Sequence, residues 1–109
     1  MEAKAAVHLH EGAQVDLATM LETLAGDYGV KRLICEGGPT LLRSLLDEGL
    51  VDEINLTYCP RIFGGVDAPT LSGSPGAFLP VTQECRLEEF EVIGEECFVR
   101  YRVNQPLPV

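Results

Sequence analysis

The chain has 109 residues, of which 46% are hydrophobic and 23% charged, and its formal net charge is −9. Its length is that of one ordinary domain, and its composition is globular rather than disordered. The acidic balance excludes the basic surface that nucleic acids and anionic membranes require. No apolar run approaches the roughly 18 residues that cross a bilayer, and no signal-peptide pattern is present, so we expect a cytoplasmic protein.

Apolar residues at helical spacing predict two helices. The first covers residues 17–28, with Asp16 as its N-cap and Gly29 as the C′ residue. The second begins with Pro39 at its first position, carries a stripe of leucines, and is closed by Gly49. Both are expected to cover a sheet.

Five segments have the pattern of strands: 5–9, 30–35, 53–59, 85–93 and 96–103. The run 33–35 does not alternate, which suits a central strand buried on both faces. The last two segments are joined at Gly94-Glu95 and form a hairpin, and a bulge near Glu88-Glu89 would restore the apolar phase of its first strand. Residues 60–80 hold four of the seven prolines and form a long loop.

This order, β-α-β-α-β followed by a loop and a hairpin, predicts one α/β domain over residues 1–109 with a frayed tail at 104–109. Right-handed crossovers would pair the first three strands in parallel, and the hairpin would add an antiparallel edge. The expected sheet is therefore mixed and mostly parallel, with helices on its faces.

The run Glu36-Gly37-Gly38-Pro39-Thr40 is the candidate site. A strand that turns directly into a helix leaves the first helical amides pointing outward at the positive end of the helix dipole, which suits a phosphate. A tight turn without a ligand is the alternative for the two glycines. Glu36, at the end of the expected central strand, is either a carboxylate that accepts hydrogen bonds from a heterocycle or a solvated residue.

A longer run, from Leu33 through Gly38-Pro39-Thr40 to Leu42, is followed by Gly49-Leu50-Val51-Asp52-Glu53 and by Pro60-Arg61-Ile62-Phe63-Gly64-Gly65. Together these motifs resemble the reductase domain of riboflavin biosynthesis. The resemblance implies a dihydrofolate-reductase-like fold and the NADPH-dependent reduction of a ribosylamino-pyrimidine phosphate, in which the ribosyl group becomes a ribityl chain. It also implies a homodimer.

The resemblance assigns Glu36 to the pyrimidine substrate and implies no catalytic nucleophile or base. The segment that it assigns to the NADPH phosphates consists of Gly37, Gly38, Pro39, Thr40, Leu41, Leu42, Arg43 and Ser44. The resemblance covers nearly the whole chain but only the C-terminal half of the family's domain, so we expect either a fragment or a shortened relative. An inactive nucleotide-binding or oligomerising module, and a related pterin or pyrimidine reductase, remain alternatives.

Other residues carry weaker hypotheses. His8 and His10 share a face if residues 5–9 are a strand, but they have no third ligand nearby, so no metal site is expected. Arg61 and Arg43 are either phosphate contacts or solvated arginines. The four cysteines are expected to be reduced, and the acidic residues of the hairpin are expected to form a solvated face. These acidic residues are Glu84, Glu88, Glu89 and Glu91.

Overall fold

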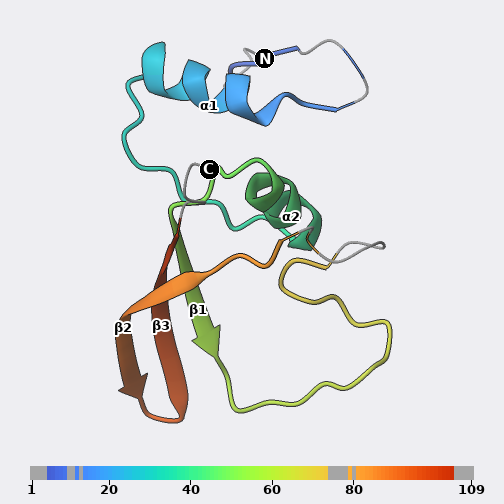
Figure 1. Ribbon diagram of the computed structural model, residues 1–109, viewed down its shortest axis with the longest axis vertical. Coiled ribbons are helices and arrows are strands. Elements are labelled where there is room, and N and C mark those ends of the chain that lie inside the picture. The colour runs from blue at the N-terminus through green and yellow to red at the C-terminus, as the bar shows by residue number, and fades with distance from the viewer. Residues whose placement is uncertain (1–4, 10–11, 13, 74–78, 80, 105–109) are drawn as a thin grey trace. The chain divides into compact units, whose positions relative to one another are not determined.

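The computed structural model describes residues 5–9, 12, 14–73, 79 and 81–104, and the chain divides into two compact units, Met1–Ile34 and Cys35–Val109. The first unit contains helix α1, Leu17–Gly26. The second contains helix α2, Pro39–Asp47, and the strands β1, Glu53–Tyr58, β2, Cys85–Ile93, and β3, Glu96–Val103 (Figure 1). Within the described ranges, no helix is long and apolar enough to cross a membrane.

Helix α1 begins at the predicted cap. Asp16 is extended, and its carboxylate accepts a hydrogen bond of 3.1 Å from the backbone N–H of Thr19. The helix ends at Gly26 and Asp27 caps it, so Gly29, with φ of 65°, comes two residues after the cap, one later than predicted. A hydrogen bond of 3.0 Å joins His8 Nε2 to the hydroxyl of Tyr28. His10 lies outside the described residues.

Helix α2 has both of its predicted ends. Pro39 occupies the first turn, where its missing N–H has no consequence. At the other end Gly49 has φ of 67°, a conformation that side chains disfavour. The N–H of Gly49 donates to the carbonyl of Leu46 at 3.1 Å, and the N–H of Leu50 donates to that of Leu45 at 2.9 Å. These two bonds form a Schellman motif, which satisfies carbonyls that the helix end leaves open.

The three strands form one antiparallel sheet with β3 between β1 and β2 (Figure 1). The predicted hairpin is confirmed: its two-residue turn begins at Gly94, with φ of 61°, as a type II′ turn requires. The predicted bulge is also confirmed, because the register between β2 and β3 shifts between Leu87 and Glu89. The long loop follows β1, and residues 74–78 and 80 of it lie outside the described ranges.

Side-chain alternation gives the sheet one apolar and one polar face. The apolar face consists of Ile54, Leu56, Tyr58, Cys85, Leu87, Phe90, Val92, Cys97, Val99, Tyr101 and Val103. On this face Val99 and Val103 of the central strand are buried and Ile54 and Leu56 of β1 are partly buried. Four outer side chains are more than half exposed, namely Tyr58, Leu87, Phe90 and Val92.

Ion pairs cross the polar face. The bulge places Glu88 within 3.3 to 3.8 Å of Arg86, Arg100 and Arg102, and Arg100 Nη2 lies 3.1 Å from Glu89 Oε2. Two of the four acidic residues that were expected to be solvated are therefore paired with arginines. Because β3 supplies two of these arginines, the pairing depends on the antiparallel register.

The α/β class is confirmed, but the predicted parallel pairing is wrong within the part of the chain that the structure describes. Segments 5–9 and 30–35 are not strands, and every ladder among the described residues is antiparallel. An extended segment becomes a strand only when a neighbouring backbone pairs with it. Leu33 and Ile34 have the expected apolar character, yet both are exposed and neither has a ladder partner.

Candidate functional site

The candidate site is the start of α2. Gly38 is the N-cap residue, with φ of 111° and ψ of 164°, a backbone region that only glycine adopts readily. A Cβ added to Gly38 would meet nothing within 4 Å. Glycine is thus required here by the backbone conformation, and the space beside it is open enough for a ligand.

The first turn of α2 presents two backbone donors. The first bond of the helix runs from the N–H of Leu42 to the carbonyl of Gly38, at 3.0 Å. The N–H groups of Thr40 and Leu41 precede that bond, and within the described ranges neither has an acceptor. Because Pro39 has no N–H, these two amides and the exposed Thr40 side chain are the donors of this turn.

The rest of the predicted cofactor segment is engaged in the helix itself. Arg43 Nε lies 3.1 Å from Asp47 Oδ1, one turn further along. Asp47 lies at the C-terminal end of the helix, where the helix dipole disfavours a negative charge, and the ion pair with Arg43 offsets that cost. The hydroxyl of Ser44 donates to the carbonyl of Thr40 at 3.1 Å. Residues 38–41 therefore form the open part of the site, while Arg43 and Ser44 have partners within α2.

Glu36 and Gly37 lie in the extended segment before the helix. Glu36 is exposed, which fits both a carboxylate that is available to a ligand and a solvated residue. A Cβ on Gly37 would lie 3.3 Å from Cys35 Sγ, so a side chain there would require the thiol to move. Position 37 therefore favours glycine because the Cys35 thiol packs close to it, whereas position 38 favours glycine because of its backbone conformation.

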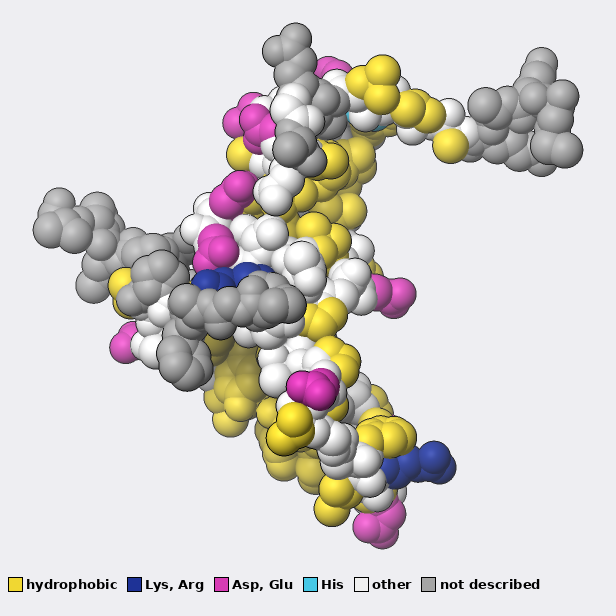
Figure 2. Space-filling model, turned by 90° about the vertical axis from the view of Figure 1, so that its right-hand side faces the viewer, with side chains coloured by type: hydrophobic (Ala, Val, Ile, Leu, Met, Phe, Trp, Pro, Cys, Tyr) yellow, Lys and Arg dark blue, Asp and Glu magenta, His cyan; other side chains and the backbone are white. Residues whose placement is uncertain are grey.

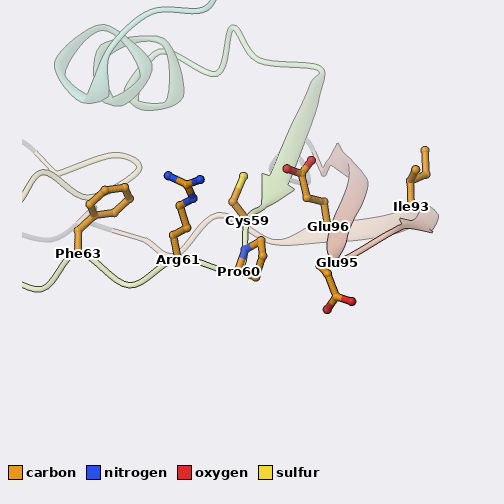
Figure 3. A pocket seen from close by; sticks show the side chains of 7 residues that line it. All are labelled: Cys59, Pro60, Arg61, Phe63, Ile93, Glu95 and Glu96. Atoms are coloured by element: carbon orange, nitrogen blue, oxygen red, sulfur yellow. The ribbon is translucent and has the colours of Figure 1, made fainter.

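A second feature is an open groove of about 560 Å³ at the far end of β1. Its lining residues are Cys59, Pro60, Arg61, Phe63, Ile93, Glu95 and Glu96. In Figure 3 the side chain of Arg61 extends to the same side as those of Cys59 and Glu96, whereas Glu95 points to the opposite side. No residue of the 36–44 segment lines this groove, so the structure does not unite Arg61 with Glu36 in one pocket.

Sequence reasoning misses the hairpin residues of this groove, although the loop motif that contains Arg61 is among those that carry the family resemblance. Tyr58 pairs with Cys97 across the sheet, which brings the end of β1 beside the hairpin turn. Nothing local in the sequence signals this pairing. Within the described residues, no group of three or more potential ligands is arranged to hold a metal ion.

Comparisons with known proteins relate the chain to one family. The model of the RibD C-terminal domain matches residues 1–99. The 2,5-diamino-6-ribosylamino-4(3H)-pyrimidinone 5′-phosphate reductase of Archaeoglobus fulgidus is 44% identical over 92 residues, which are 84% of this chain and 40% of that protein. The reductase of the same name from Methanothermobacter thermautotrophicus is 42% identical over 93 residues, 84% of this chain and 42% of that protein.

Solved structures share the fold. A pyrimidine reductase-like protein from Corynebacterium diphtheriae superimposes with a TM-score of 0.72 at 29% identity, over 86% of this chain and 37% of that one. RibD of Acinetobacter baumannii has a TM-score of 0.72 at 24% identity, over 84% of this chain and 26% of that one. The predicted dihydrofolate-reductase-like fold is confirmed for the matched part. The chain spans about two fifths of the length of the two curated relatives.

Proposed function

The chain belongs to the RibD C-terminal domain family, and we propose that it carries the cofactor-phosphate part of a pyrimidine reductase. The proposed reaction is the NADPH-dependent reduction of a ribosylamino-pyrimidine phosphate in riboflavin biosynthesis. The observation that supports this proposal most is the open start of α2. Gly38 there has a backbone conformation that only glycine adopts readily, and the N–H groups of Thr40 and Leu41 have no acceptor among the described residues. The named relatives support the choice of substrate class.

In this proposal the amides of Thr40 and Leu41 donate hydrogen bonds to phosphate oxygens of the cofactor, and the Thr40 hydroxyl adds a third donor. The positive end of the helix dipole favours the negative charge there. Gly38 keeps the approach open because it has no side chain. Arg43 belongs to the segment that the resemblance assigns to the cofactor, but its charge is offset by Asp47 one turn further along.

NADPH, when bound, supplies the hydride, and the residues of this chain position the reactants. Glu36 is exposed at the end of the segment that leads into the site, and we assign its carboxylate to the N–H groups of the pyrimidine. The same assignment suits a pterin, so a related pterin or pyrimidine reductase is the neighbouring possibility. A comparison of the two heterocycles as substrates would separate them.

We further propose that the complete reductase works in the cytoplasm as a homodimer. The proposed cytoplasmic location rests on the biosynthetic role of the family. A second candidate function is an inactive nucleotide-binding or oligomerising module. The open start of α2 would serve a nucleotide-binding module without activity equally well.

The test is a calorimetric titration of the folded chain with NADPH. Saturable binding that Gly38→Asp abolishes would support the site at the start of α2. Gly94→Asp is the matched control, because it adds the same charge in the hairpin turn, where a Cβ also meets nothing within 4 Å. Binding that both variants weaken equally, or no binding by a folded chain, would refute the cofactor site. The oligomerising module would then become the preferred function.

A further inference from the structure

Arg43 lies on the same face of α2 as the open first turn. Residues three and four apart are neighbours on a helix surface, so Arg43 follows Pro39 and Thr40 on one face. About 4.5 Å of helix rise separates Arg43 from Thr40. A long side chain in a helix ordinarily leans back toward the N-terminus, over the preceding turn. In that orientation the Arg43 guanidinium would lie beside the open amides.

In the structure, Arg43 instead contacts the next turn of the helix. Its Nε–H donates to Asp47 Oδ1 at 3.1 Å. The Arg43 side chain is only 17% exposed, against 43% for Asp47, so the guanidinium is held close to the protein. Carboxylates and phosphates bind the same planar donors of a guanidinium. Asp47 is therefore placed to compete for Arg43 with a phosphate bound at the start of α2.

The order of the two charges along α2 favours a role in ligand binding over a role in helix stability. An ion pair four residues apart stabilises a helix more when the acid precedes the base, because each charge then faces the favourable end of the helix dipole. Here the base, Arg43, comes first and the acid, Asp47, lies near the C-terminal end. The observed order costs helix stability but places the cation on the side of the phosphate site.

The charge of the whole protein gives this competition weight. The net charge is −9, and acidic side chains outnumber basic ones on the face of the protein that Figure 2 shows. This charge balance repels an anionic ligand, and a cation beside the ligand offsets the repulsion. A change in the partner of Arg43, from Asp47 to the ligand, should therefore alter the affinity measurably.

We propose that Asp47 is a positioning residue that competes with the cofactor phosphate for Arg43 and thereby lowers the affinity of the site. Without ligand, the guanidinium is bound to Asp47. When a phosphate binds to the amides of Thr40 and Leu41, the guanidinium exchanges its charge-assisted hydrogen bond to Asp47 for one to the phosphate, and the carboxylate becomes solvated. This inference rests on the proposed function, because it requires an anion at the start of α2.

The test is a calorimetric titration of the full chain with NADPH, with folding verified by circular dichroism. The informative variant is Asp47→Asn, which removes the competing charge and keeps the shape of the side chain. Glu48→Gln is the matched control. It removes the same charge one residue further along, where Glu48 is exposed and has no ion pair among the described residues. Both substitutions are also made in an Arg43→Met background.

We expect Asp47→Asn to tighten NADPH binding at least threefold and Glu48→Gln to change it less than 1.5-fold. In the Arg43→Met background, Asp47→Asn should also change the affinity less than 1.5-fold, a loss that a merely structural role of Asp47 would not produce. Binding by Asp47→Asn but not by the wild type would support the proposal too, as an extreme case of the competition.

The proposal is overturned if Asp47→Asn leaves NADPH affinity unchanged or weakens it, or if its effect persists in the Arg43→Met background. Equal tightening by Glu48→Gln would also overturn it, since the effect would then come from net charge alone. If the wild type binds NADPH and Asp47 has no effect, the proposed function stands and only this inference fails. If no folded variant binds NADPH, both fail together.

Discussion

Replacement of Gly38 by alanine tests the start of α2 without introducing charge. The backbone of Gly38, at φ 111° and ψ 164°, lies in a region that is essentially confined to glycine. A Cβ there meets no atom within 4 Å, so the penalty comes from the backbone and not from a clash. We expect the free energy of unfolding to fall by about 1–3 kcal/mol.

The assay is chemical denaturation followed by circular dichroism, with NADPH titration of the same samples. A loss of 1.4 kcal/mol corresponds to about a tenfold change in an equilibrium constant. If the backbone instead shifts to relieve the strain, the amides of Thr40 and Leu41 move with it. NADPH affinity would then fall even where stability is preserved.

Gly26→Ala is the matched control. Gly26 ends α1, has no positive φ, and likewise has open space where a Cβ would stand. Alanine there should raise stability by about 0.5–1 kcal/mol, since it lowers the entropy of the unfolded chain. The reasoning about Gly38 fails if its alanine variant keeps both the stability and the NADPH affinity of the wild type.

Three further substitutions probe separate features. Asp16→Ala removes the acceptor for the Thr19 N–H and should reduce unfolding free energy by about 1 kcal/mol; unchanged helicity and stability by circular dichroism would contradict the cap. Glu88→Ala should lower stability by about 0.5–1 kcal/mol more than Glu91→Ala, because Glu88 bridges three arginines. This difference should shrink in 1 M salt during thermal denaturation, and a salt-independent difference would exclude an electrostatic origin. Thr40→Val should weaken NADPH binding several-fold while leaving the melting temperature within about 2 °C, and equal affinity would remove the hydroxyl from the proposed site.

Local sequence determines those parts of the fold whose causes lie within a few residues. The cap at Asp16, the Schellman end at Gly49, the hairpin turn at Gly94 and the bulge after Leu87 were each predictable from residue type and spacing. The phosphate-binding hypothesis at the start of α2 has the same character. It follows from the order of a glycine pair, a proline and a threonine.

Some features depend on residues that are distant in the sequence. The ion-pair cluster around Glu88 and the groove beside Arg61 both arise from antiparallel partners of β3. The density of acidic residues predicts a solvated acidic face. That prediction misses the ion pairs, because the sequence alone does not reveal which arginines lie across the sheet. Pairing places Arg100 and Arg102 opposite the bulge and turns two of those acids into partners.

The helices, the hairpin, the family and the residues of the candidate site could all be inferred from local residue patterns and motifs. Which apolar segments become strands depends instead on backbone pairing between distant parts of the chain. Leu33-Ile34-Cys35 reads as a buried strand, yet it is exposed and has no ladder, because hydrophobicity expresses a tendency to be buried and does not provide a partner.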